Sequence, residues 1–204
     1  MLTELHTSFI INITRVNSLF SLYTVILSQN SQKQGRVDWQ LSDLLRAATV
    51  FLYATLEDFI RSILKWRLPE QKGTSLNRVP LKGLNSNGHP EKFYLGRLEE
   101  FRDLTVSELI RDSVHEFVNR SSFSSTDDIA SILESVGIDL EELRSFFPTL
   151  QELIVRRHNI VHRADRNDRT GSGHHHVKSI GRHHVNIWIK TVDEFCNKLI
   201  QQLS

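Results

Sequence analysis

The sequence has little of what marks several classes of protein. Its single cysteine, Cys196, has no partner for a disulfide or a CxxC metal site, so we interpret it as a small buried hydrophobic residue. The segment 1–14 has no basic start and contains Glu4, His6 and Asn12, which does not suit a secretory signal. No later run approaches the roughly 18 apolar residues of a membrane span. We therefore expect a cytoplasmic protein without a membrane partner.

Net charge is also small. The formal charge is +1 at pH 7, with 25 Lys and Arg against 24 Asp and Glu, so no global positive field would attract nucleic acid. The segment 151–190 is the exception, because it holds eight Lys or Arg against three acids and seven of the ten histidines. Any chemistry on a polyanion is therefore expected in this segment.

Apolar residues recur every three or four positions and predict helices over most of the chain. Two long helices, about 2–30 and from Asp38 or Ser42 to about Leu68, should form an antiparallel hairpin. The segment 70–95 is rich in Gly, Pro, Asn and Ser and is expected to be a loop or an insertion. Further helices are expected over about 101–119, 129–136 and 186–203, with another beginning near Pro148.

These predictions combine into one fold class. Ser125 to Asp128 offers caps for the helix over 129–136, and Gly137 suits its left-handed end. Convincing strand patterns and internal repeats are missing from the sequence. We therefore expect a single domain over residues 1–204 that is all-α: an antiparallel helical bundle with extra short helices and one long loop.

The helix near Pro148 carries an arginine on its apolar side. Its predicted buried face is made by Leu150, Leu153, Ile154 and Val161. Arg157 falls on this face, where an unpaired guanidinium would cost several kcal/mol. Either an acid such as Glu57 or Asp58 pairs with Arg157, or this face lines an open cleft that receives an anionic ligand.

His158 and His162 lie four residues apart, so their side chains share one helical face at a spacing of about 6 Å. The pair could bind a metal, but a third ligand is needed and the sequence has no HExxH glutamate. It could also be a surface pair without function, or it could perform acid–base catalysis on a phosphate beside Arg157. The clusters His174–His176 and His183–His184 favour a solvated loop over a zinc site.

The string Val155–Asp165 resembles the signature of HEPN domains, an arginine followed after four to six residues by a histidine. It is especially similar to the bacterial branch of the RiboL-PSP-HEPN type. The segments 123–133 and 171–189 resemble what flanks the motif in that branch. The first two helices match the family only by their apolar pattern, and within them the segment Leu56–Phe59 is the most similar to it. The resemblance implies a HEPN-type helical bundle.

The resemblance also implies an endoribonuclease that needs no metal or other cofactor. Arg157 would bind the phosphate and His162 would transfer protons, while the 2′-hydroxyl of RNA attacks the phosphate. The auxiliary residues would be His158, Asn159, Arg156 and Glu57. The family often has Asn or Asp directly after the arginine, whereas His158 stands there, so Arg156 with five intervening residues is a second possible register; the helical face favours Arg157.

The partners implied by the resemblance are an RNA substrate such as tRNA, a second copy of the chain that completes a composite site, and an antitoxin or regulatory protein. A toxin or antiphage role would fit the family. The alternative is a noncatalytic HEPN module that binds RNA, a nucleotide or a protein partner through the same groove. Composition alone also allows a helical scaffold with a metal-binding histidine loop.

Overall fold

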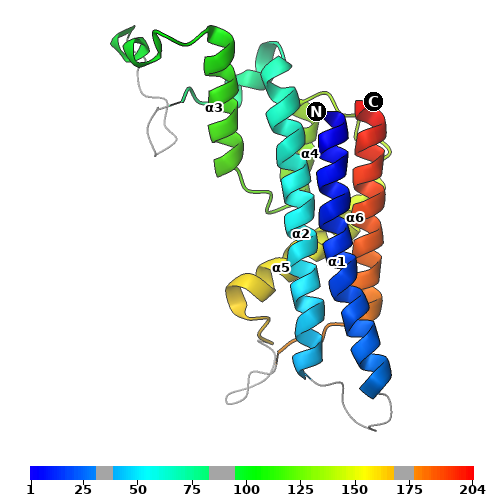
Figure 1. Cartoon of the computed structure of the whole chain (residues 1–204). Helices are drawn as coiled ribbons and strands as arrows, with labels where there is room; N and C mark the ends of the chain where they lie inside the picture. Colours follow the sequence, from blue (N-terminus) through cyan, green and yellow to red (C-terminus); the bar gives the residue numbers. More distant parts are fainter. Residues whose placement is uncertain (31–38, 83–94, 168–176) are drawn as a thin grey trace.

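The structure is a computed structural model that describes residues 1–30, 39–82, 95–167 and 177–204 (Figure 1). Within these ranges the secondary structure is helical, without a strand, and the predicted all-α fold is confirmed. The main helices are α1 (Leu2–Asn30), α2 (Trp39–Arg67), α3 (Val106–Arg120), α4 (Thr126–Ser135), α5 (Phe147–Arg163) and α6 (Arg182–Leu203). The short 3-10 helices are η1 (Leu68–Glu70), η2 (Gly73–Arg78), η3 (Leu95–Phe101) and η4 (Arg144–Phe146).

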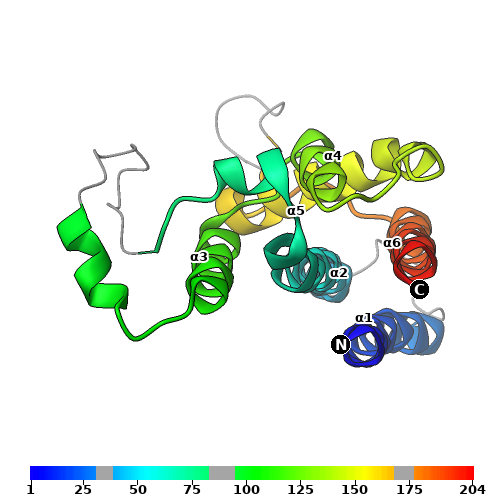
Figure 2. The ribbon, with the colours of Figure 1, turned by 90° about the horizontal axis from the view of Figure 1, so that it is seen from above.

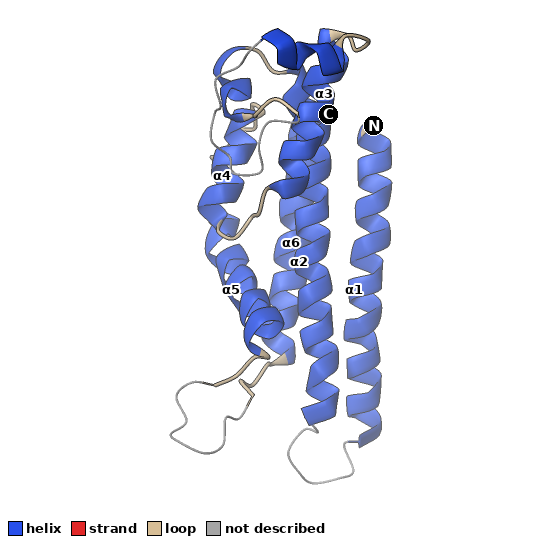
Figure 3. Cartoon of the chain, turned by 90° about the vertical axis from the view of Figure 1, so that its left-hand side faces the viewer, coloured by secondary structure: helices blue, strands red, loops and turns tan. Residues whose placement is uncertain are grey.

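The long helices α1, α2 and α6 run side by side, and α1 and α2 form the predicted antiparallel hairpin (Figures 1 and 2). Figure 3 places α1 on one side of α2 and α6, and α4 and α5 on the other. Val16, Leu45 and Ile60 have no exposed surface where these helices meet. Each fully buried aliphatic side chain of this kind contributes roughly 1.5–3 kcal/mol to folding. The layer of α2 and α6 therefore supplies the interior face on which α5 rests.

The predicted interior of α1 is present, but its outer side is also apolar. Phe9 and Val16 are buried against the bundle, whereas Ile11, Leu22 and Val25 are 57%, 47% and 51% exposed. Among the described residues, the segment Leu2–Gln29 alone is long and apolar enough to cross a membrane by length and composition, and 17% of its most apolar window is buried. A mostly buried core helix and a signal sequence near the N-terminus pass the same test.

Helix boundaries follow the local capping groups. The third helix starts at Val106 and not near 101, because Thr105 and Glu108 form a capping box and a 3-10 turn occupies 95–101. Ser125 and Asp128 form the second box, which confirms the predicted cap of α4. Gly137 has a φ of +81°, as predicted for the residue after that helix.

Two other predicted segments differ in detail. The last helix begins at Arg182, four residues before its predicted start, with Gly181 as its N-cap. The predicted loop 70–95 contains η2, and its part from 83 to 94 lies outside the described residues. Cys196 is buried and free, and burial raises the pKa of its thiol well above the usual value. This agrees with its interpretation as a small interior residue.

Candidate functional site

The motif residues gather at a cavity of about 350 Å³ between α5, α2 and the segment that leads into α4. Helix α5 crosses the lower half of α2 obliquely (Figure 1). Its inner face, formed by Leu150, Leu153 and Ile154, is buried as predicted. The cavity is lined by Tyr53, Glu57, Ser122, Ser124, Ile154, Val155, Arg157, His158 and His162. The fold thus brings both histidines of the motif to the same opening as its second arginine.

The Arg157 guanidinium lies over an aromatic ring. Its central carbon is 4.7 Å from the centroid of the Tyr53 ring, a cation–π contact. Its Nε is buried and has no hydrogen-bond partner in the part of the chain that the structure describes. A partly buried guanidinium without an acceptor favours an incoming anion.

The acid predicted as a possible partner of Arg157 is used elsewhere. Glu57 Oε1 accepts a hydrogen bond from Arg61 Nη2 at 2.7 Å, and Asp58 is exposed. Arg61 also donates to the carbonyl oxygens of Val118 and Ser121, which holds the end of α3 against α2. Of the two possibilities drawn from the sequence, the ion pair with Glu57 or Asp58 is therefore not formed, and Arg157 faces an open cavity.

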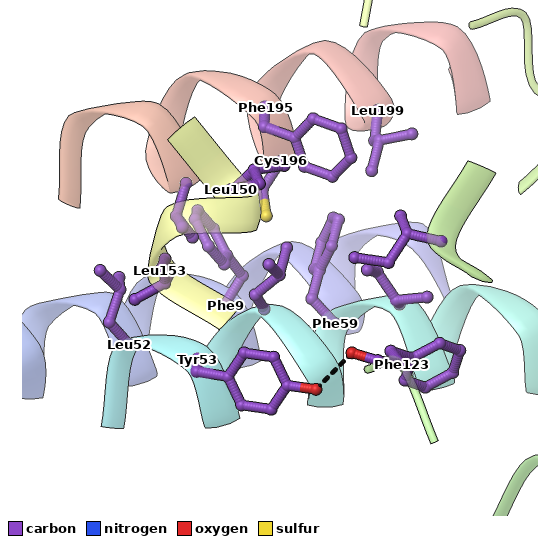
Figure 4. Close-up of a cluster of buried hydrophobic side chains, with 14 of the residues drawn as sticks. Phe9, Leu52, Tyr53, Phe59, Phe123, Leu150, Leu153, Phe195, Cys196 and Leu199 are labelled. Carbon is purple, nitrogen blue, oxygen red and sulfur yellow. Dashed lines mark hydrogen bonds between the residues drawn. The ribbon is translucent and has the colours of Figure 1, made fainter. Parts of the chain in front are cut away.

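Tyr53 is the residue of this site that the sequence motif did not indicate. Its ring is 4% exposed, and its hydroxyl donates to the Phe123 carbonyl oxygen at 2.6 Å (Figure 4). Burial, followed by the negative charge of Glu57, raises the pKa of Tyr53 to about 12, against the opposing effect of Arg157. Tyr53 is therefore a neutral phenol at physiological pH that presents a fixed ring face to Arg157. The only sequence signal was its spacing of four from Glu57 on the second helix.

The two histidines lie next to each other along one side of α5, with their rings tilted. The ring centroids of His158 and His162 are 4.7 Å apart with an interplanar angle of 45°, closer than the predicted 6 Å. Both side chains are exposed, and so is Val161 at 46%, which corrects its prediction as a core residue. Residues 161–164 at the end of α5 are exposed, so the described part of the chain covers the apolar side of this turn only in part.

Arg156 and Asn159 do not join this cavity. Successive residues of an α-helix are rotated by about 100°, which puts these two side chains on the neighbouring face of α5. Arg156 Nη2 donates to Asp165 Oδ2 at 2.7 Å and to the carbonyl oxygens of Lys178 and Ser179 at 3.1 and 3.0 Å. The alternative register, with Arg156 as the phosphate-binding arginine, is therefore disfavoured because that guanidinium already has anionic and carbonyl partners.

Asp165 joins the end of α5 to α2 and to the start of the last segment. It is 1% exposed, and its Oδ2 also accepts from Arg46 Nε at 2.8 Å. Arg46 Nη2 and Arg156 Nη2 both donate to the Lys178 carbonyl oxygen. Ala164 and Asp165 have φ angles of 47° and 54°, a left-handed conformation that is unfavourable for these residues and needs such contacts to persist. These four residues, Arg46, Arg156, Asp165 and Lys178, are called the Asp165 clamp below.

The remaining histidines do not add a metal centre to the described part of the chain. His174–His176 lie outside the described residues. His183 and His184 occupy the first turn of α6, and the His184 ring centroid is 6.4 Å from that of Trp188. Across the described ranges no group of three or more His, Cys, Asp or Glu is placed to hold a metal ion.

Comparison with models of protein families gives a match over most of the chain. The model of the family described as RiboL-PSP-HEPN matches residues 12–204. No curated protein and no solved structure gives a significant match.

Proposed function

The chain belongs to the RiboL-PSP-HEPN family, and from this premise we propose that it is a metal-independent endoribonuclease. Membership in the family indicates an RNase or a nucleotide-binding module. The observation that favours cleavage is the position of Arg157, whose buried Nε has no described partner, beside two histidines in one cavity. Anion binding alone would need the arginine but not the two adjacent imidazoles.

The proposed reaction uses a nucleophile that RNA carries itself. A base removes the proton of the 2′-hydroxyl, and the 2′-oxygen forms a bond with the adjacent phosphorus while the bond from phosphorus to the 5′-oxygen breaks. An acid protonates the departing 5′-oxygen. The products are a 2′,3′-cyclic phosphate and a 5′-hydroxyl, so neither water nor a metal enters this step.

Each motif residue has a role that its chemistry allows. Arg157 offers a planar set of N–H donors to the phosphate oxygens, where negative charge accumulates in the transition state. His162 transfers protons, because imidazole ordinarily titrates near neutral pH. His158, whose ring lies 4.7 Å from that of His162, orients this imidazole. Glu57 assists indirectly by holding Arg61, which supports the far wall of the cavity.

A homodimer would complete this site. The base and the acid must act on opposite sides of the phosphorus, and one His162 can occupy only one side. The partner's His162 would supply the second proton-transfer group if two α5 helices faced each other. Val155 and Val161, which are 50% and 46% exposed beside the histidines, would then be covered. The dimer is therefore proposed on the exposed side of α5.

The proposed biological role rests on the fact that this chemistry needs no cofactor. An RNase of this kind is active as soon as it folds and dimerises, so a cell that makes it needs an antitoxin or a regulatory partner. We propose a cytoplasmic toxin or antiphage effector that cleaves tRNA or other cellular RNA. Induced expression should then stop bacterial growth, and the His162→Ala variant should not.

The direct test is cleavage of end-labelled total tRNA by the purified protein in excess EDTA. Wild type should generate fragments that end in 2′,3′-cyclic phosphate, and His162→Ala should lose at least about 100-fold in rate, the usual scale for a proton-transfer group. His6→Ala is the matched control, because it removes an exposed histidine from α1, far along the chain from the motif.

Three results would contradict parts of this proposal. RNA that is bound but left intact by the wild-type protein would favour the noncatalytic HEPN module. Cleavage that stops in EDTA and returns with a divalent metal would contradict the metal-independent mechanism. Equal activity of wild type and His162→Ala would remove His162 from the reaction.

A further inference from the structure

A second and larger cavity, of about 500 Å³, opens on the neighbouring face of α5. Its walls are α5, the segment 178–181 and the first turns of α6. Its volume lies within the range of small-molecule sites, about 300–1,000 Å³. Arg156 and Asn159 of the motif line this space, but the proposed chemistry does not use it.

The two cavities share Val155, which is exposed along the ridge of α5. Ile154 and His158 project to one side of this ridge, and Gln151 and Asn159 project to the other. An α-helix with its side chains measures about 10–12 Å across. A strand that crosses the ridge with one phosphate at Arg157 would therefore bring a neighbouring nucleotide to the second cavity.

The second cavity contains the groups with which proteins recognise unstacked bases. His184, which is exposed, and Trp188, which is 6% exposed, lie along one wall with ring centroids 6.4 Å apart. An exposed aromatic ring such as that of His184 can stack on a base. On the α5 side, Gln151 Oε1 already accepts hydrogen bonds from Thr126 N at 2.9 Å and Thr126 Oγ1 at 3.2 Å. Its Nε2 has no hydrogen-bond acceptor among the described residues, and Gln151 lines the cavity.

Glu152 supplies the complementary acceptor. Its carboxylate is exposed at the cavity, and within the described ranges it forms no ion pair and no hydrogen bond. Two carboxylate oxygens match two adjacent N–H donors, and the Gln151 amide, which lines the same cavity, matches a carbonyl acceptor. Guanine presents this arrangement on its Watson–Crick edge, with N1–H and N2–H beside O6, whereas adenine, cytosine and uracil do not.

We propose that this cavity binds a guanine base of the RNA strand close to the scissile phosphate and so gives the enzyme its sequence preference. The inference rests on the proposed ribonuclease function, because it names the substrate feature read beside the same site. Lys178, which also lines the cavity, supplies a positive charge for the phosphate of the bound nucleotide.

The first measurement detects binding without cleavage. Guanosine 5′-monophosphate, added to the full chain, should quench tryptophan fluorescence more strongly than adenosine 5′-monophosphate. The quenching should be lost in Trp188→Phe, which identifies the responding ring, and weakened in Glu152→Gln. It should persist in His162→Ala, because that residue lies at the other cavity. Equal responses to both nucleotides, or a response unchanged by Glu152→Gln, would overturn the proposal.

The second measurement uses a randomised RNA pool in EDTA with sequencing of the cut ends. Wild type should enrich guanine at one fixed position relative to the cut, and Glu152→Gln should reduce this enrichment by roughly 10-fold, the scale of one bidentate base contact. Glu194→Gln is the matched control, because Glu194 is exposed on α6 and does not line the cavity. Cleavage without a preferred base would overturn the guanine site but leave the nuclease intact; guanine-specific quenching without cleavage would support the site and reject the nuclease.

Discussion

At the scale of single residues, Tyr53 has two separable functions in one side chain. Its hydroxyl donates to the Phe123 carbonyl oxygen, and its ring lies under Arg157. Tyr53→Phe keeps the ring and leaves the buried carbonyl unpaired, so we expect the free energy of unfolding at pH 7 to fall by about 1–2 kcal/mol. RNA cleavage should stay near the wild-type rate. Tyr53→Leu should lower both quantities, because it also removes the ring face.

Tyr53→Phe should also change how the free energy of unfolding responds to alkaline pH. Because burial raises the pKa of Tyr53 to about 12, the phenol is neutral in both the folded and unfolded states below pH 10. Between pH 10 and 12 it ionises mainly in the unfolded chain, which lowers the stability of wild type as pH rises. Tyr53→Phe lacks this loss, so urea unfolding across this window should show the two stabilities converging. A difference that stays constant from pH 9 to 12 would contradict the raised pKa.

The residues of the site were not equally predictable. Arg157, His158 and His162 lie within one helical turn or two of each other, so local spacing was enough to bring them together. Tyr53 lies on a helix about 100 positions earlier in the sequence, and no local sequence pattern predicts its contact with Arg157 over that separation. The sequence predicted an acid or an open cleft for Arg157. In the structure its guanidinium contacts the Tyr53 ring, and Glu57, which lines the same cavity, is held by Arg61.

At the scale of elements, the Asp165 clamp determines where α5 ends. Asp165→Asn leaves the guanidinium groups of Arg46 and Arg156, whose side chains are 12% and 16% exposed, without their common carboxylate. Removing one partner of a buried ion pair costs about 3–5 kcal/mol, and asparagine returns part of this as a neutral acceptor. We expect unfolding in urea to show a loss of roughly 2–3 kcal/mol. The rate of RNA cleavage should fall as well, because His162 lies one turn before the clamp.

A double-mutant cycle isolates the clamp from general damage. Arg46→Met should destabilise wild type strongly and the Asp165→Asn variant much less, because the buried charge that Arg46 neutralises is then already gone. Asp43→Asn is the matched control: Asp43 also pairs with Arg46, at 3.1 Å, but its side chain is 59% exposed, and surface pairs contribute little. Strictly additive losses of Arg46→Met and Asp165→Asn would reject a shared ion pair.

Helix positions were more predictable than helix ends. Apolar periodicity placed α1 and α2 closely, because both are long and have one face buried against the same core. The start of α3 was predicted too early because Phe101 and Leu104 continue the apolar spacing through η3 and the turn, while Thr105 and Glu108 set the real boundary. The prediction that Val161 is buried was wrong for a related reason. Apolar periodicity identifies which face of a helix is buried, but not how far along the helix axis the bundle covers that face.

At the scale of the whole molecule, two apolar surfaces compete as the dimer interface. One is the outer side of α1 with Ile11, Leu22 and Val25, and the other is the exposed side of α5 with Val155 and Val161. The composite site requires the second. In sedimentation experiments, Val161→Glu should therefore convert dimer to monomer and abolish RNA cleavage, whereas Val25→Glu should do neither. The reverse result would place the dimer on α1 and separate the two motifs.

A mixed dimer tests whether the two protomers share catalysis. A wild-type chain and a His162→Ala chain, co-expressed with different affinity tags and purified together, hold one His162 between them. If the base and the acid are the His162 residues of the two protomers, the mixed dimer lacks one proton-transfer group, and its cleavage rate should fall to that of the His162→Ala homodimer. A wild-type dimer that carries both tags is the control. If each protomer acts alone, the mixed dimer keeps one intact site and about half of the wild-type rate, a result that would overturn the composite site while leaving the catalytic residues in place.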